Sequence, residues 1–324
     1  MRKTTRPMGL AMGLAMVLAV AAALLLRPGA AAAAEELRIG ISQYPTTLHP
    51  SREASVAKSY VNSMTQRPMT VYDHQWELIC MLCTELPLIE AGTAIPEDLP
   101  PEVEGAGDGR GIALKYTIQP AATWGDGTPI TTRDVLFTWK AGKHPTAGIG
   151  NLELYRRIYA IDVVDDKTFW MHYDRISFEY AAINDFRLLP AHIEEPIFDA
   201  APEDYRNRTA FDTEPTNPGL WFGPYRITEA VPGSRLVLQP NETWWGQQPA
   251  FERITILTIE QTTALEANLL SGNIDMIAGE LGLTLDQALA FEKRHGEDYQ
   301  VIYEPSLLYE HIDLMLDNPI LQDK

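Results

Sequence analysis

The chain has 324 residues, of which 45% are hydrophobic and 9% aromatic, and its formal net charge is −18. That composition is sufficient to bury one large core or two smaller ones, so it excludes general disorder. An acidic surface is repelled by phosphate backbones and by anionic lipids, so we expect no nucleic-acid partner.

Residues 1–34 differ from the rest of the chain. A basic start, "MRKTTR", precedes an apolar run over residues 8–26 and an alanine-rich stretch that ends at residues 32–34. This order predicts a secretory signal that is cut before Glu35, and therefore a periplasmic protein. The alternative is an uncleaved membrane anchor, because an apolar run of 19 residues could just span a bilayer.

The only two cysteines, Cys80 and Cys83, lie in "ELICMLCTELP". In an oxidising compartment such a pair forms a local disulfide or a redox centre. The flanking apolar residues favour a structural role, either paired or buried. An exported thiol oxidoreductase remains the alternative.

The first half of the chain contains several strand signals. "LRIGIS" (37–42) predicts a strand, and helical spacing appears in the later part of "QYPTTLHPSREASVAKSYVNSM". "IALKYTIQP" alternates like a half-buried strand, and "DVVDDKTFWMHYD" predicts a hairpin. The glycines of "GAGDGRG" do not match the dinucleotide pattern, since Arg110 occupies the third glycine position, so we expect a surface hairpin connection there.

The second half alternates strands with helices. After two strand signals in "RLVLQPNETWWGQQPAFERITILTI", we expect a helix from Thr263, a strand at "IDMIAG", a helix at "LDQALAFEKRHG" and a strand at "YQVIYEP". Thr263 with Glu266, and Thr284 with Gln287, match the capping box, and Gly272 suits a helix C-terminus. This alternation predicts a mixed α/β sheet.

The stretch "WGDGTPITTRDVLFTWK" (124–140) could begin a phosphate or metal site. Its Gly-Asp-Gly-Thr-Pro segment is also typical of a tight turn. Thr131 and Asp134 form an acidic variant of the capping box, so Asp134 is expected to bind backbone N–H groups. We therefore interpret the stretch as a turn followed by a helix cap.

No catalytic motif is apparent. The seven histidines include no pair at the i, i+4 spacing of a helical zinc site, and there is no Gly-x-Ser-x-Gly elbow or Walker loop. We therefore expect no catalytic residue, metal or cofactor. A hydrolase with a dispersed site is the open alternative.

Several blocks of the sequence resemble one family in the same order. "WGDGTPITTRDVLFTW", "PTTLHP", "LLPAHI", "FGPYRI", "NETWWGQQPAFERITI", "ALEANLLSGNIDMI" and "LDNPILQDK" are similar to segments of the periplasmic solute-binding proteins of peptide and nickel ABC importers, extracellular solute-binding protein family 5. Two blocks depart from the pattern: Trp221 and Phe222 replace small residues, and Trp244 replaces a tyrosine.

The resemblance implies an α/β fold of the periplasmic binding protein type, class II and three-lobed, with the second large lobe largely missing. It places residues 36–68 and 188–305 in domain I, 69–187 in an inserted domain II, and 306–324 at the start of domain III. We therefore expect a fragment or truncated product. The alternative is a shortened but functional binding protein.

The resemblance also implies a function without catalysis: capture of di- or oligopeptides in the periplasm and delivery to the membrane permease of an ABC transporter. Nickel or a nickel chelate is the alternative ligand for the same fold. Trp221 and Phe222 could stack on a ligand, although packing is the expected role. The candidate ligand contacts are Tyr44, Arg52, Glu53 and Asn151.

Overall fold

The computed structural model describes residues 34–103, 109–304, 312, 314–315 and 317–321. The predicted signal segment therefore lies outside the described residues, apart from Ala34. The chain divides into two compact units, Met1–Gly282 and Leu283–Lys324. Each unit is described by itself below, and the domain boundaries expected from the resemblance stay predictions.

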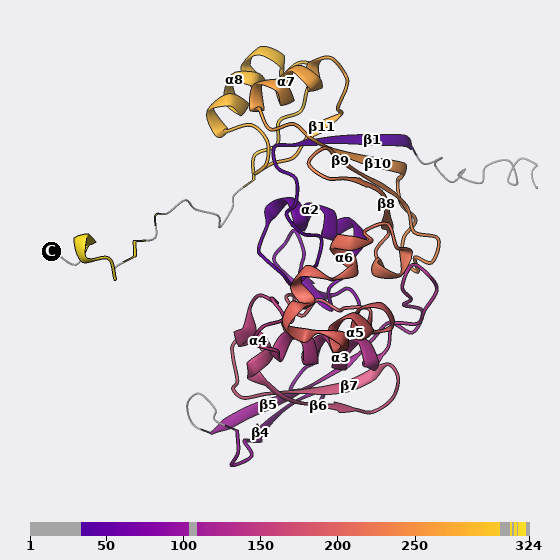
Figure 1. Ribbon diagram of the computed structural model, residues 1–324, viewed down its shortest axis with the longest axis vertical. Helices are drawn as coiled ribbons and strands as arrows, with labels where there is room; N and C mark the ends of the chain where they lie inside the picture. Colours follow the sequence, from indigo (N-terminus) through magenta and orange to yellow (C-terminus); the bar gives the residue numbers. More distant parts are fainter. Residues whose placement is uncertain (1–33, 104–108, 305–311, 313, 316, 322–324) are drawn as a thin grey trace, which may run out of the picture. The chain divides into compact units, whose positions relative to one another are not determined.

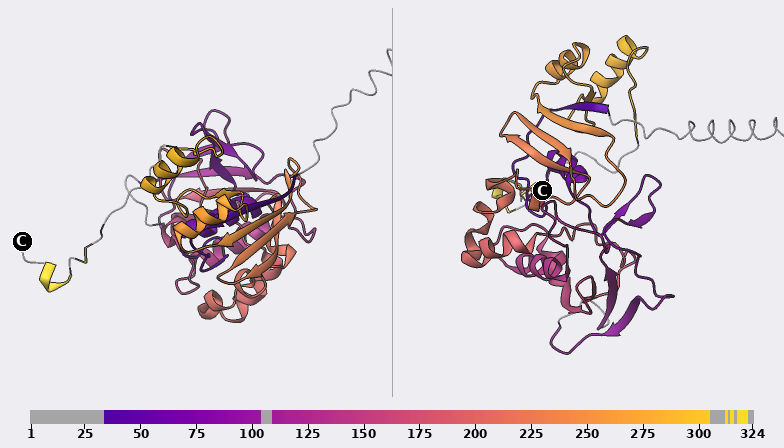
Figure 2. Two further views of the ribbon diagram at one scale, coloured as in Figure 1. Left: turned by 90° about the horizontal axis from the view of Figure 1, so that it is seen from above. Right: turned by 90° about the vertical axis from the view of Figure 1, so that its right-hand side faces the viewer.

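A five-stranded mixed sheet contains the first described strand and the strands that follow residue 224. Its order is β11-β1-β10-β9-β8. β1 pairs in parallel with both β10 and β11, whereas β9 pairs antiparallel with β10 and β8. Figures 1 and 2 show β1 beside β10 in views turned by 90°. The bounds are β1 Ala34–Ile41, β8 Tyr225–Val231, β9 Arg235–Pro240, β10 Phe251–Thr258 and β11 Met276–Ile277.

The middle of the first unit forms two antiparallel sheets. One is the hairpin of β2 and β3, and the other has the order β4-β5-β7-β6. Pro96 lies in β4, at the edge of its sheet, where a residue without a backbone N–H is tolerated. The bounds are β2 Thr70–Tyr72, β3 Leu78–Cys80, β4 Ala94–Asp98, β5 Arg110–Thr117, β6 Ile158–Val163 and β7 Thr168–Tyr173.

Helices connect the strands of the first unit, and α8 and η3 belong to the second unit. α3 and α4 lie against the four-stranded sheet (Figure 1), and Trp139 of α3 donates its indole N–H to the carbonyl of Ile158 at 3.0 Å. The bounds are α2 Val56–Thr65, α3 Thr132–Lys143, α4 Leu152–Arg157, α5 Ala191–Ala200, α6 Ala210–Thr213, α7 Thr262–Leu270 and α8 Leu285–His295, with 3-10 helices η1 Pro202–Asn207, η2 Pro218–Leu220 and η3 Pro319–Leu321.

Most of the expected elements are confirmed. The first strand, the polar-segment helix, the 162–174 hairpin and the strands on either side of residues 241–250 are all present. Both the Thr131–Asp134 and the Thr284–Gln287 capping boxes form. Gly272 follows the end of α7 with φ +73°, a left-handed conformation that glycine adopts without strain. The mixed α/β sheet expected from the alternation is also found.

Two expectations are wrong. α7 begins one residue earlier than predicted, so its N-cap is Gln261, without a side-chain cap bond, and Thr263 lies inside the helix. Residues 299–304 form no strand, because no partner strand pairs with them among the described residues, and an unpaired strand has no ladder to stabilise it.

Candidate functional site

A cavity of about 520 Å³ lies beside α2. Its wall includes the segment that precedes this helix, one face of α2 itself, the loop before α4 and the segment 185–187. This volume is within the ordinary range for small-molecule sites. We call it the α2 cavity.

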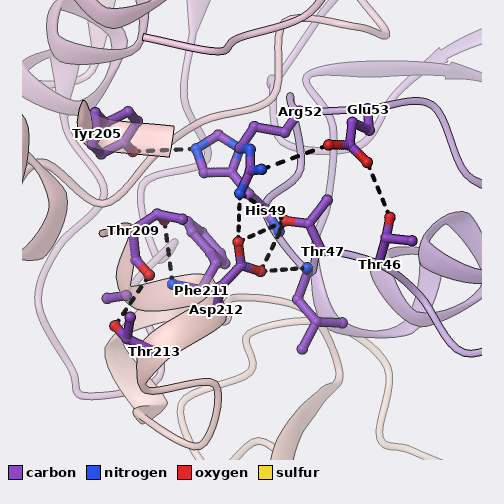
Figure 3. A network of polar contacts seen from close by, with 12 residues as sticks. Thr46, Thr47, His49, Arg52, Glu53, Tyr205, Thr209, Phe211, Asp212 and Thr213 are labelled. Carbon is purple, nitrogen blue, oxygen red and sulfur yellow. Dashed lines mark hydrogen bonds and ion pairs between the residues drawn. The ribbon is translucent and has the colours of Figure 1, made fainter. Parts of the chain in front are cut away.

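A network of polar contacts fixes the segment that precedes α2 (Figure 3). Arg52 Nη1 lies 2.6 Å from Asp212 Oδ2, and the Thr47 hydroxyl donates to the same carboxylate at 2.8 Å. The backbone N–H of Leu48 donates to Asp212 Oδ1 at 3.0 Å. On the other side, Arg52 Nη2 is 3.7 Å from Glu53 Oε1. Asp212 therefore orients the Arg52 guanidinium at the cavity wall while neutralising much of its charge.

His49 supports the same segment from within the core. Its Nδ1 accepts the backbone N–H of Ser51 at 3.1 Å, and its Nε2 lies 3.2 Å from the Tyr205 hydroxyl (Figure 3). Burial lowers the pKa of the His49 imidazole well below its usual value. The ring is thus neutral and carries its proton on Nε2.

Lys58 ties the segment to α2. Its buried ammonium donates to the carbonyls of His49 at 3.1 Å and Glu53 at 2.6 Å, and also to that of Arg52. Burial lowers the pKa of Lys58 to about 8. Because all three acceptors belong to the segment 49–53, Lys58 holds the backbone of the cavity wall in one conformation.

The structure brings three of the four predicted contacts to one place. Arg52, Glu53 and Asn151 all line the α2 cavity, whereas Tyr44 does not. Tyr44 is half-buried and packs against the core, and burial raises the pKa of its phenol. Asn151 has φ 51°, and the preceding residue, Gly150, donates its N–H to the carbonyl of Ser51 at 2.7 Å. This bond holds the loop before α4 against the segment before α2.

The polar residues of the same wall that the sequence did not indicate include Asn62, Gln66, Arg67 and Arg187. Asn62 lies in α2, and Gln66 is the C-cap of this helix, whose backbone N–H donates to the carbonyl of Asn62. The two amides, four positions apart at the end of a predicted helix, were a usable signal. Arg187 gave no such signal, because nothing in the sequence relates it to α2.

Trp221 and Phe222 pack in the core rather than lining the cavity. Both are buried, Trp221 donates its indole N–H to the carbonyl of Pro215 at 2.8 Å, and Phe222 meets Trp124 edge to face at 4.7 Å between ring centroids. Replacing small residues with large ones at this turn therefore fills the core.

The glycine-rich turn of 124–129 is stabilised within the protein. Asp126 accepts the backbone N–H of Thr128 at 2.9 Å and lies 2.9 Å from His192 Nε2. Asp134 is 3% exposed and accepts the backbone N–H groups of Thr131 and Ala191. Both carboxylates thus have structural partners.

Cys80 and Cys83 are joined in a disulfide. Within the described ranges, no cluster of three or more His, Cys, Asp or Glu could hold a metal ion. No described helix has both the length and the apolarity needed to cross a bilayer.

Comparison with known proteins gives concordant results. The model of bacterial extracellular solute-binding proteins, family 5 Middle, matches residues 109–324. An oligopeptide-binding protein, OppA, of Mycobacterium bovis is 32% identical over 189 residues, which cover 56% of this chain and 30% of that protein.

Solved structures show the same fold. The oligopeptide-binding protein of Thermus thermophilus, complexed with a pentapeptide, has a TM-score of 0.67 at 23% identity, over 78% of this chain and 46% of that one. AppA of Bacillus subtilis, in complex with a nonapeptide, has a TM-score of 0.60 at 18% identity, over 75% and 43%. The chain thus spans less than half the length of the proteins it matches. The fold class expected from the sequence is confirmed, and the chain belongs to family 5 of the bacterial extracellular solute-binding proteins.

Proposed function

We propose that this chain captures short peptides outside the cytoplasm, in the periplasm, and forms part of the solute-binding component of an ABC importer, which passes the peptide to a membrane permease. The observation that carries this proposal is the α2 cavity, which has a volume of about 520 Å³ and is lined by Arg52, Glu53 and Asn151. The oligopeptide-binding relatives support it.

The chemistry of this wall suits a peptide. A peptide offers backbone N–H and C=O groups together with terminal charges, and the cavity offers amides and side chains of both charges. The Glu53 carboxylate is suited to an amino terminus, because its side chain is more than half exposed and, among the described residues, it accepts one hydrogen bond, from Thr46 at 3.2 Å, beside the 3.7 Å ion pair with Arg52. We propose that Arg52 acts mainly by orienting Glu53, since Asp212 already neutralises it.

The cavity favours binding over chemistry. Its lining contains neither histidine nor cysteine, so it offers no imidazole base and no thiol nucleophile. No observation on the described residues favours the nickel, thiol oxidoreductase or hydrolase alternatives over a peptide ligand. The proposal is therefore a binding protein without catalysis.

The test is calorimetric titration of the purified chain with an equimolar mixture of tetrapeptides. Glu53→Gln should weaken binding about tenfold, which corresponds to about 1.4 kcal/mol and is the scale of one charge-assisted hydrogen bond. Glu242→Gln is the matched control, because Glu242 is exposed and lies outside the cavity lining. Equal affinities of the two variants for the mixture would contradict the assignment of Glu53, and absence of binding by the unmodified chain would contradict the function.

A further inference from the structure

The α2 cavity is lined by buried polar atoms that have no partner. Gln66, the C-cap of α2, is 1% exposed, and neither its Oε1 nor its Nε2 makes a hydrogen bond to any described residue. Asn62, one turn earlier in α2, is 7% exposed, and its Oδ1 also lacks a partner in the described part of the chain. Buried amides are nearly always satisfied, because an unmade hydrogen bond leaves the full desolvation penalty. Three such atoms at one cavity indicate a site whose partners come from a ligand or from water.

Arg187 is the basic residue of the lining that has no bonding partner of its own. Arg52 pairs with Asp212, and the ammonium of Lys58 is surrounded by three carbonyls. Arg67 donates to the carbonyls of Ser63 and Gln66 at 2.6 and 2.7 Å.

The Arg187 guanidinium, in contrast, makes no hydrogen bond and no ion pair within 4.0 Å to any residue in the described part of the chain, although it is half-buried at the cavity. Burial lowers the pKa of Arg187, which reflects lost hydration, while the nearby Asp185 carboxylate raises it. Asp185 is exposed, so its carboxylate offsets only part of the lost hydration. A half-buried guanidinium in this state gains most from a planar anion that can accept two parallel N–H bonds.

The charge of the cavity is opposite to that of the chain. Its lining contains four cationic side chains and two carboxylates, and although Asp212 neutralises Arg52 from outside the lining, the cations still outnumber the carboxylates, whereas the whole chain has a net charge of −18. A positive cavity in an acidic protein concentrates the field where an anionic group would enter. The cations are Arg52, Lys58, Arg67 and Arg187, and the carboxylates are those of Glu53 and Asp185.

We propose that the α2 cavity selects ligands that carry a carboxylate, which binds the Arg187 guanidinium, while Asn62 and Gln66 hydrogen-bond an adjacent amide of the ligand. A glutamine side chain has two N–H donors and one carbonyl acceptor, which complement the C=O and N–H of a peptide group. That the ligand is a peptide rests on the proposed function. The carboxylate could belong to the C-terminus or to an acidic side chain.

The experiment is isothermal titration at neutral pH and low salt with four probes. Three are tetrapeptide mixtures: free acids without Asp and Glu, the same mixture with C-terminal amides, and an amidated mixture that includes Asp and Glu. The fourth probe is succinate. Each is titrated into the unmodified chain, Arg187→Gln and Arg133→Gln. Arg133 is the control, because its guanidinium is exposed, pairs with Glu195 at 3.0 Å and lies outside the cavity lining.

We expect the unmodified chain to bind one carboxylate-bearing mixture at least tenfold more tightly than the amidated mixture without Asp and Glu. Tighter binding of the free acids would identify the C-terminus, and tighter binding of the amidated mixture with Asp and Glu would identify a side chain. Arg187→Gln should abolish the difference, and Arg133→Gln should preserve it.

The remaining outcomes separate the two proposals. If all three mixtures bind equally and Arg187→Gln changes nothing, the carboxylate inference is wrong and peptide binding stands. If only succinate binds and Arg187→Gln removes this binding, the carboxylate site stands and the peptide function is wrong. Absence of binding by every probe would refute both.

Gln66→Met provides a second, independent readout. Methionine has a similar length and no buried amide, so the ligand-free variant should melt at a higher temperature than the unmodified chain. At the same time it should bind the preferred mixture at least fivefold more weakly. A lower melting temperature with unchanged affinity would mean that Gln66 has a purely structural role, and would refute its place in the ligand site.

Discussion

Asp134→Ala tests whether a single carboxylate stabilises two helices. Asp134 Oδ2 accepts the N–H of Thr131 at 2.8 Å and thereby completes the cap of α3. Its Oδ1 accepts the N–H of Ala191, the first residue of α5, at 2.9 Å. α5 has Pro190 at its N-cap and no cap bond from that residue, so Asp134 caps it from another helix.

The burial of Asp134 determines how much stability the Asp134→Ala substitution removes. Removing the carboxylate leaves two backbone N–H groups without partners at a site that is 3% exposed, and each such group costs about 1–3 kcal/mol. Burial raises the pKa of Asp134, so its charge is itself partly unfavourable and some of the cost is recovered. The two groups together would cost about 2–6 kcal/mol. We therefore expect Asp134→Ala to lower the free energy of unfolding by about 3 kcal/mol, in the lower part of this range.

The assay is urea denaturation followed by circular dichroism, with Thr131→Ala as the matched control. Thr131 Oγ1 accepts backbone N–H groups in the first turn of α3, that of Arg133 at 3.3 Å, and it caps this helix alone, so its removal should cost about 1 kcal/mol. The loss of unfolding free energy in Asp134→Asn should lie between those of Asp134→Ala and Thr131→Ala, since the amide oxygen of asparagine can still accept one N–H group. If Asp134→Ala costs no more than Thr131→Ala, the carboxylate acts only as the local cap, and the reasoning about α5 is refuted.

Three further changes should have measurable effects. Gly223→Ala should lower the free energy of unfolding by about 2 kcal/mol in the same assay, because its Cβ would lie 2.5 Å from backbone at the end of α2, and an unchanged midpoint would contradict this. In the folded state His49 has a lowered pKa and accepts the N–H of Ser51, so on acidification its imidazole takes up a proton more readily in the unfolded state than in the folded state. Stability should therefore fall as the pH drops below about 6.5, and a smaller fall is expected in His49→Gln; parallel pH profiles would show that His49 is not responsible. Replacing both Cys80 and Cys83 with Ala should lower the free energy of unfolding by about 2 kcal/mol, as expected for a short disulfide loop, and leave the affinity for peptides unchanged. A loss of affinity at normal stability would indicate that the disulfide has a role in the site.

Local patterns account for the elements that the sequence predicted correctly. The Thr131–Asp134 box, the Thr284–Gln287 box and the glycine after α7 involve residues within four positions of one another, so their geometry is set by neighbours in the chain. Thr263 shows the limit of such patterns, because α7 begins at Thr262, with Gln261 as its N-cap, and Thr263 lies inside the helix.

The sequence named part of the cavity lining, and the role of these residues as ligand contacts stays a prediction. Arg52 and Glu53 were named because they follow a strand in a segment that resembles the family, and they line the cavity together with Asn151. Tyr44 belongs to the same segment, but its side chain packs on the core. Which side chains of a loop face a cavity depends on the surfaces that the loop touches, and a single sequence does not record them.

By itself, therefore, the sequence determined the secondary structure of the strongly periodic segments, the local caps and the family to which the chain belongs. The tertiary structure alone decided that Asp212 neutralises Arg52 across 160 positions, that Asp134 caps α5, and that Arg187 lines one cavity with Asn62 and Gln66. These contacts join residues that are far apart in the chain, and their existence depends on how the sheets and helices pack. Packing also decides which polar groups keep a partner and which are left to bind something else.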